Sequence, residues 1–282
     1  MLDFLASRIE AWTVTMTSPR MAVAIAFLLL LLAWDIAKRG WTLSWSRRAI
    51  KGVFASISIF HINLLFVPVV WAGSEYVKHG YAALGIPGIA VEAWAGWPLW
   101  VLAPLAVIAY DFADYWTHRV LHIRSLWPIH AIHHSDPDVN GLTSYRIHFL
   151  EGLAMWVCYA LLLTWIGLPP AAIGIAALFR ALHNIYVHVD VDWDHGPFHF
   201  VLASPRFHRW HHTDDPRAYD RNLANVLPVW DLLFGTYRNL GKLDAPLGAS
   251  GVPQHDIVRL TLWPFLEWAK LVKPRPQTEA AR

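Results

Sequence analysis

The first two thirds of the chain alternate long apolar stretches with short polar ones. Five apolar stretches approach the roughly 20 residues that cross a bilayer core: 21–34, 53–73, 94–111, 152–167 and 168–182. The last two are separated by a proline pair and predict a hairpin over about 152–182, either fully spanning or shallow and re-entrant. The pattern therefore predicts an all-α, integral-membrane helical bundle of about four to five membrane helices or hairpins.

The charges beside these stretches predict an orientation. Five basic residues lie between the first and second stretches, whereas the linker before the third carries only Lys78. They are Lys38, Arg39, Arg47, Arg48 and Lys51. The positive-inside rule places that linker, and with it the end of the third stretch, in the cytoplasm, and we expect a bacterial inner membrane. Acidic Asp3 and Glu10 stand where a signal peptide is basic, so we expect the first stretch to be a retained anchor.

Composition supports the membrane class. Hydrophobic residues make up 56% of the 282 and charged residues 16%, whereas charged residues run near 25% in soluble domains. The single Cys158 excludes an internal disulfide and a thiolate zinc site. A net charge of +2 without a basic run gives no reason to expect a nucleic-acid partner.

The composition changes after Asp111, because 13 of the 16 histidines fall between His118 and His212. We expect an apolar part at 1–110, a histidine-rich part at 111–240 that includes the hairpin, and an interfacial helix with a frayed end at 241–282. No Ser/Gly-rich linker divides them, so the first two parts are expected to form one domain with the histidines on a helical cap.

Two segments echo each other, WPIHAIHHSDP from Trp127 and SPRFHRWHHTDDP from Ser204. Each has a proline shortly before His-x-x-His-His, and proline is favoured in the first turn of a helix. Ser204 is a good N-cap ahead of Pro205, while Pro137 and Pro216 end the segments. The echo predicts two short helices of the same design.

Histidines at i, i+3 and i+4 share one helix face, and this spacing occurs repeatedly. Eight imidazoles have it: His118, His122, His130, His133, His134, His208, His211 and His212. A single histidine on an apolar face is more often an ordinary core residue, but the joint pattern favours metal ligands, and eight ligands indicate two ions. A structural zinc site fits less well, since such sites close with four ligands and favour cysteine.

Other polar residues near these boxes are weaker candidates. His183 and His188 are five residues apart and therefore about 140° apart on a regular helix, so both cannot face the other histidines. His183 is favoured as a ninth ligand, because His188 would need a helix end or a bulge to face them. Asp111, Asp114, Asn222 and Asn225 are candidates to hold the ligands' other ring nitrogens. Solvated loops or helix caps are the alternative for the two asparagines.

The boxes DFADYWTHRVLH, HAIHHS, HNIYVH and SPRFHRWHH, followed by WDLLFGTY, resemble those of the fatty acid hydroxylase and sterol desaturase superfamily of integral-membrane oxygenases. The resemblance covers roughly 111–237. It implies a diiron centre at the cytosolic face of a helical bundle, O2 as oxidant and a lipid C–H bond as target. Zinc can replace iron in purified protein, because imidazole sites accept it readily.

This chain departs from some relatives in the third box, where Val187 stands at the position of a second histidine and His188 follows one residue later. The segment TSYRIHFLE, with Glu151, also resembles a family stretch, for which support of a ligand or helix-end packing are both open. The resemblance favours hydroxylation of a fatty acyl, sterol or related lipid, with desaturation by the same centre as the alternative. No recognisable residue decides between the two reactions or identifies the lipid.

Electrons have to come from elsewhere, since the sequence has neither a dinucleotide-binding Gly-x-Gly-x-x-Gly after a strand nor a cysteine set for an iron–sulfur cluster. A separate carrier protein and reductase are therefore expected. A basic face could dock an acidic carrier or lie on the membrane surface: Arg119, Arg124, Arg206, Arg209, Arg217 and Arg221. A metal or haem transporter is less favoured, because only His61 lies clearly within an early apolar stretch. A zinc hydrolase is less favoured, because no His-Glu-x-x-His motif occurs.

Overall fold

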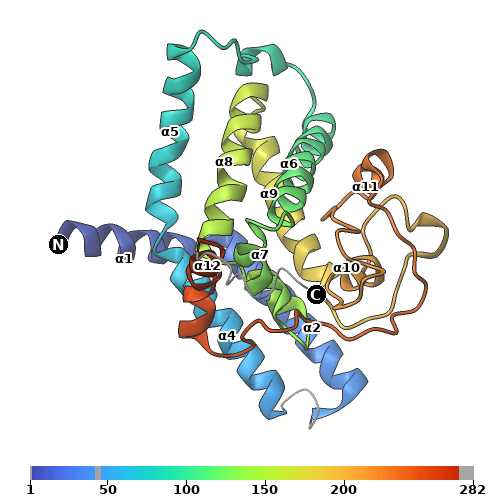
Figure 1. Ribbon diagram of the computed structural model, residues 1–282. Coiled ribbons are helices and arrows are strands. Elements are labelled where there is room, and N and C mark those ends of the chain that lie inside the picture. Colours follow the sequence, from blue (N-terminus) through green and yellow to red (C-terminus); the bar gives the residue numbers. More distant parts are fainter. Residues whose placement is uncertain (1, 42–45, 273–282) are drawn as a thin grey trace, which may run out of the picture.

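The computed structural model describes residues 2–41 and 46–272, which form helices and loops with no strand among them. Figure 1 shows the arrangement. The long helices are α1 (Leu2–Met16), α2 (Pro19–Arg39), α4 (Arg47–Leu64), α5 (Val67–Ala83), α6 (Leu99–Leu121), α8 (Phe149–Ile166), α9 (Pro170–Val187) and α12 (Ile257–Val272). The short ones are α7 (Trp127–His134), α10 (Pro205–His211), α11 (Val229–Phe234) and the 3-10 turns η1 (Val91–Trp94), η2 (Gly141–Tyr145) and η3 (Gly196–Phe198). The all-α prediction is confirmed.

The core of the bundle is the packing of α6 against α8 and α9, and these helices rise together with α5 in the upper part of Figure 1. Ala106 of α6 and Ala172 and Ala176 of α9 are fully buried in one apolar cluster. Small residues at such a contact let two helix backbones approach closely, as helices in membranes do. This contact fixes where α6 and α9 end, and both end in the histidine region.

Three helices within the described residues are long and apolar enough to cross a membrane: α2, α8 and α9. The last two form the hairpin predicted over about 152–182, and Gly167 ends α8 in the left-handed conformation (φ 65°). A Cβ atom there would lie 1.9 Å from the Ile89 carbonyl oxygen, so only glycine fits this turn. These helices confirm an integral-membrane bundle.

Two predicted stretches have different boundaries. The stretch 53–73 is not one helix, because α4 ends at Leu64 and α5 begins at Val67. Pro68 stands in the first turn of α5, where its missing N–H and its ring break the preceding helix. The stretch 94–111 is also divided: Trp94 closes η1, and α6 begins only at Leu99, from which it runs through residue 110 to Leu121.

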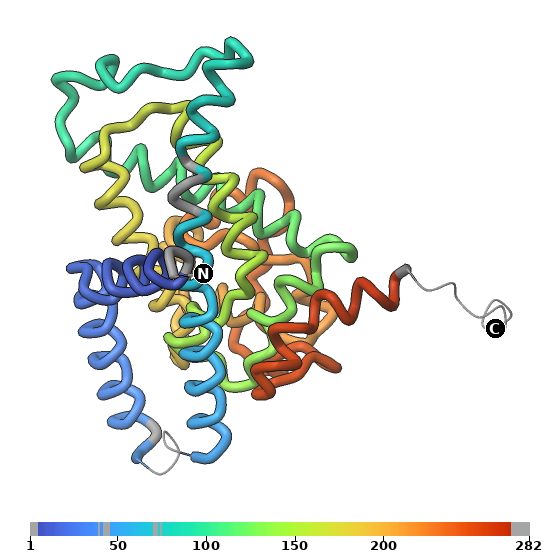
Figure 2. The backbone as a smooth tube through the Cα atoms, turned by 90° about the vertical axis from the view of Figure 1, so that its left-hand side faces the viewer, coloured from blue at the N-terminus to red at the C-terminus, as the bar shows by residue number. Residues whose placement is uncertain are grey.

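The first membrane helix lies along α9 in the same direction. Arg20, at the start of α2, reaches Gly174, and Leu28 and Leu31 further along α2 lie against Gly141, which also contacts Ile185 of α9. In Figure 2, α2 and α4 descend together from the level of the N-terminus. Their basic end therefore lies on the side where α9 ends.

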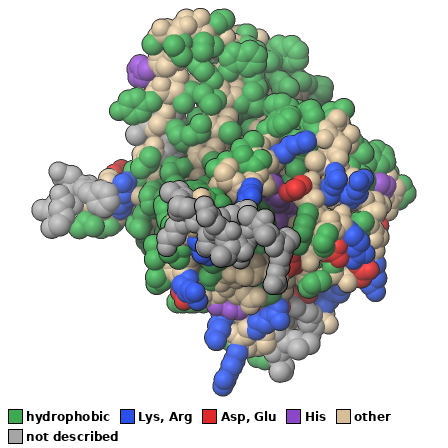
Figure 3. All heavy atoms as spheres, in the orientation of Figure 1, with side chains coloured by type: hydrophobic (Ala, Val, Ile, Leu, Met, Phe, Trp, Pro, Cys, Tyr) green, Lys and Arg blue, Asp and Glu red, His purple; other side chains and the backbone are tan. Residues whose placement is uncertain are grey.

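The surface divides in the same way. In Figure 3, apolar side chains cover the upper part of the molecule, and Lys, Arg, Asp and Glu gather on the lower part. The predicted C-terminal amphipathic helix is α12, which packs on α7 and α4. The predicted frayed end falls on residues 273–282 and lies outside the described residues.

Candidate metal centre

Two short helices of the same design bring the histidines together. Ser204 caps α10 by accepting a hydrogen bond from the Phe207 N–H, and Pro205 follows it, as predicted. Pro128 stands in the first turn of α7. Each helix directs its histidines to two places, because neighbouring side chains such as His133 and His134 are about 100° apart around a helix.

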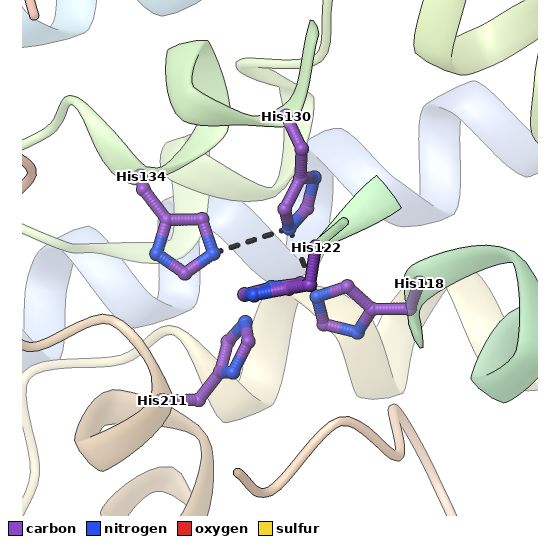
Figure 4. A group of neighbouring side chains, drawn as sticks. All are labelled: His118, His122, His130, His134 and His211. Atoms are coloured by element: carbon purple, nitrogen blue, oxygen red, sulfur yellow. Dashed lines mark hydrogen bonds between the residues drawn. The ribbon is translucent and has the colours of Figure 1, made fainter. Parts of the chain in front are cut away.

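Nine histidines form two groups, in each of which the ligand atoms lie within 4.8 Å of one another. The first group, drawn in Figure 4, consists of His118, His122, His130, His134 and His211. The second consists of His133, His188, His208 and His212. The groups are adjacent, since the His134 and His212 rings stack with centroids 4.5 Å apart. Eight histidines predicted from spacing are thus brought together, in two sets.

The nitrogen spacing suits metal ligation. In the first group His130 Nε2 lies 2.9 Å from His118 Nε2 and 3.1 Å from His134 Nε2. In the second, His188 Nε2 lies 3.2 Å from His133 Nε2 and 3.1 Å from His208 Nε2. Two nitrogens each about 2.1 Å from one ion and at right angles to each other are about 3 Å apart, so the observed spacing fits ligands of a shared ion.

Backbone carbonyls fix which ring nitrogen is free. His118 Nδ1 donates to the Leu223 carbonyl (2.6 Å), His188 Nδ1 to that of Asn184 (2.6 Å) and His211 Nδ1 to that of Arg221 (2.8 Å). A carbonyl only accepts, so Nδ1 carries the proton in each ring and Nε2 keeps its lone pair. The Nε2 atom of His211 is buried without a hydrogen-bond partner among the described contacts. Lone pairs that face one another in this way fit a cation between them.

Burial also keeps these rings neutral. It holds the pKa of His130, His133 and His134 well below the ordinary value, with nearby histidines adding to the effect. Burial likewise lowers the pKa of His188 to about 4. The histidines of α10 and His212 behave in the same way. Neutral imidazole is the form that binds a metal ion, so at neutral pH these histidines are in the form that a metal site requires.

Two carboxylates orient further histidines of the first group. Glu151, at the start of α8, accepts a hydrogen bond from His130 Nδ1 at 2.8 Å, and both side chains are buried. Asp220 accepts one from His122 Nδ1 at 3.2 Å. The resemblance of TSYRIHFLE to a family stretch pointed to Glu151. Sequence reasoning missed Asp220 and the three carbonyls, and every residue has a backbone carbonyl, so no residue type could have indicated those three.

The third box reverses the order expected for its two histidines. His188, not His183, belongs to the second group. His188 is the residue directly after α9 (φ −88°, ψ −5°), so the chain has left the regular helix and its ring turns to the group. His183 is buried within α9 beside the rings of Phe179 and Tyr186.

Asp111 acts on a loop, not on a histidine. Its carboxylate accepts hydrogen bonds from the Val226 and Leu227 N–H groups and from Trp230 Nε1, at 2.7 to 3.0 Å. Asp231 similarly accepts from the Leu223 and Ala224 N–H groups, both at 2.8 Å. Together they hold the loop whose Leu223 carbonyl fixes His118.

The other predicted supporting residues lie around the groups. Asp114 pairs with Arg180 of α9, and Asn222, at a left-handed position (φ 56°), donates to the Phe207 carbonyl. Asn225 is buried and lines a cavity beside the histidines. Within the described residues, Asp114 and Asn222 form their hydrogen bonds with residues other than histidines, so the structure places them one step further out than the sequence predicted.

A helical membrane bundle that carries two adjacent all-histidine groups defines a membrane protein with a candidate histidine-box metal centre. The model of the fatty acid hydroxylase family matches residues 103–236, which include every histidine of both groups. Over this segment the match bears out the resemblance that the histidine boxes predicted.

Individual relatives cover parts of the chain. It is 30% identical to an alkylglycerol monooxygenase from Xenopus tropicalis over 66% of this chain and 39% of the relative. It is 32% identical to an ornithine lipid hydroxylase from Rhizobium tropici over 51% of this chain and 44% of the relative. It is 29% identical to a very-long-chain aldehyde decarbonylase from Oryza sativa over 50% of this chain and 57% of the relative. The chain thus spans about half the length of these relatives or less, and no solved structure matches it.

Proposed function

We propose that this chain is an O2-dependent lipid hydroxylase that holds one iron ion in each histidine group. The observation that carries the proposal is the division of nine buried or half-buried histidines into adjacent groups of five and four at the end of a membrane bundle. Relatives named as a lipid hydroxylase and a monooxygenase support it. Iron bound in both groups would supply the reduction of O2 and the abstraction of hydrogen from an unactivated carbon.

The protein's own part is to hold the metal ions, to orient the histidine rings and to give the substrate access to them. Carbonyls and Glu151 fix the rings so that the lone pair of each Nε2 is directed inward, and this leaves little reorganisation to be done when a metal binds. A cavity bordered by His118 and His130 of the first group and by His133 and His208 of the second gives a substrate access to both. His183 is not needed in this arrangement.

We place the metal groups on the cytoplasmic side. Arg48, in the basic segment that the positive-inside rule assigns to the cytoplasm, pairs with Asp138 at 2.6 Å, and Asp138 follows the histidine helix α7. The basic segment and the histidine cap therefore share one side of the molecule. This supports the proposed cytoplasmic side for the metal groups, and we propose a bacterial inner membrane as the sequence predicted.

A separate electron donor remains part of the proposal, but we no longer place its docking site on the basic face that the sequence suggested. Much of the basic face is neutralised, since Arg206, Arg209 and Arg217 each pair with aspartates. A larger cavity of about 410 Å³ borders His122, His134 and His211 from another side of the first group. The rim of that cavity offers an approach to the centre, so we propose that electrons enter there.

The test combines metal analysis with isotope labelling. Wild type and the variants His133→Ala and His211→Ala, one from each group, are purified from iron-supplemented cells, and membrane lipids are collected after growth under 18O2. We expect about two irons per wild-type chain, fewer in each variant, and a lipid carrying 18O only with wild type. A new double bond without 18O would indicate desaturation instead, and tightly held zinc with no change in the lipids would refute the proposal.

A further inference from the structure

The cavity that borders both histidine groups is lined largely by polar side chains. It lies between α6, α8 and α9 and has a volume of about 50 Å³. Apart from the histidines and Glu151, three apolar side chains line it, Leu121, Ile147 and Met155, and four polar ones. The polar four are Asp114, Arg180, Asn184 and Asn225. A methylene group in mid-chain offers such side chains nothing to bind.

The two charged side chains in this lining, Asp114 and Arg180, form an ion pair with each other. Arg180 Nη2 donates to Asp114 Oδ1 at 2.8 Å, a second guanidinium N–H donates to Oδ2, and the Tyr159 hydroxyl also donates to Asp114. The side chain of Asp114 is 4% exposed and that of Arg180 is 18% exposed. Because the two charges cancel, the lining carries no net positive charge for a carboxylate or phosphate group.

The two asparagines are different, because one is left with an unused donor. Asn184 stands four residues after Arg180 and therefore on the same face of α9. Asn225 is 8% exposed, and its Nδ2 has no hydrogen-bond partner among the described contacts. A buried donor without a partner is unfavourable, because it has lost its hydrogen bond to water and gained none in return. An acceptor atom supplied by the substrate would remove that cost.

We propose that Asn225, with Asn184 beside it, binds a neutral oxygen of the substrate, such as that of an ester, ether or hydroxyl group, within a few bonds of the carbon that is oxidised. The proximity follows from the small cavity, since whatever occupies it is close to the histidines and to the asparagines at once. The preferred substrate is thus a lipid oxidised near its polar end. This inference rests on the proposed hydroxylase function and names its substrate class.

The test compares two probes that differ by one atom, hexadecyl methyl ether and octadecane, in which a CH2 group replaces the oxygen. The full chain is placed in lipid nanodiscs without metal, and each probe competes with tritiated hexadecyl methyl ether for binding. We expect the wild type to bind the ether roughly threefold to tenfold more tightly than octadecane, the ratio that one neutral hydrogen bond supplies. Asn225→Leu should abolish this preference, and Asn239→Leu, the same substitution at an exposed loop position, should keep it.

Asn184→Leu is a second variant in case Asn225→Leu does not fold, and it should reduce the preference. Equal binding of both probes by the wild type, or an unchanged preference in the asparagine variants, would overturn the proposal, as would tighter binding of palmitate than of the ether. With iron and a reductant added, oxidation close to the ether oxygen supports the proposal and oxidation in mid-chain contradicts it. An ether preference without any oxidation would support the binding site and count against the hydroxylase function.

Discussion

The assignment of the third box to His188 makes a quantitative prediction for two neighbouring substitutions. His188 Nε2 lies between His133 Nε2 (3.2 Å) and His208 Nε2 (3.1 Å), so His188→Ala removes one of four nitrogens and the one that adjoins two others. Loss of a group that merely supports a ligand lowers metal affinity 10- to 100-fold. Loss of the ligand itself should cost at least about 100-fold, or roughly 3 kcal/mol.

His183→Ala is the matched control, because it removes the same kind of side chain from the last two turns of α9, shortly before His188. His183 is also buried, so its loss should lower stability, but it belongs to neither group and both groups should stay filled. After dialysis against a chelator, we expect about two metal ions per chain in His183→Ala and about one in His188→Ala, measured by mass spectrometry of the metals.

Circular dichroism and gel filtration of both variants show whether each remains folded, so that metal loss is not confused with unfolding. The opposite pattern, in which His183→Ala loses an ion and His188→Ala keeps both, would refute the reasoning and restore the order that the sequence favoured. Loss of both ions in His188→Ala would show instead that the two groups bind their metals cooperatively.

Three further predictions concern the supports of the centre and its neutral rings. Glu151→Ala should lower metal affinity about 10- to 100-fold in chelator competition and Glu151→Gln less, because glutamine still accepts from His130; equal losses would contradict this. Asp231→Asn, which leaves one acceptor oxygen for the Leu223 and Ala224 N–H groups, should cost roughly 2–3 kcal/mol and release metal from the first group before the second, as metal stoichiometry after mild heating would show. For the metal-free protein, the pKa of His188 is lowered to about 4, so the unfolded chain binds more protons between pH 6.5 and about 4. As the pH is lowered from 6.5 to about 4, the free energy of unfolding should therefore decrease by about 1 kcal/mol per pH unit for each such histidine. Melting curves unchanged between pH 7 and 5 would disprove this prediction.

Spacing along the sequence was enough for the ligands that share a helix face. The eight histidines at i, i+3 and i+4 converge as predicted, because helix geometry sets their directions once α6, α7 and α10 form and pack together. It was not enough to divide them into two groups. That division depends on how α7 faces α10, and His133 joins His212 while its neighbour His130 joins His118 through tertiary packing that no single segment encodes.

The order of His183 and His188 shows why a regular helix was the wrong frame for the third box. The argument from about 140° of rotation holds only while the helix continues, and α9 ends at Val187. At its C-terminus the last carbonyls lack helical partners, and His188 Nδ1 takes one of them, that of Asn184. The same hydrogen bond satisfies the helix end and fixes the ring nitrogen that faces the group, so the termination of α9 itself makes His188 a ligand in our proposal.

The aspartates show a related gap between sequence and structure. Asp111 and Asp114 are three residues apart on α6, and spacing predicted that both would support His118. Instead Asp111 binds the loop after α10 and Asp114 binds Arg180 of α9. Each carboxylate joins α6 to the element that carries a different part of the site, the carbonyl on His118 in one case and the polar lining of the cavity in the other. A sequence pattern shows which residues share a helix face, but the role of an acidic residue in a bundle depends on which neighbouring element it contacts in the folded structure.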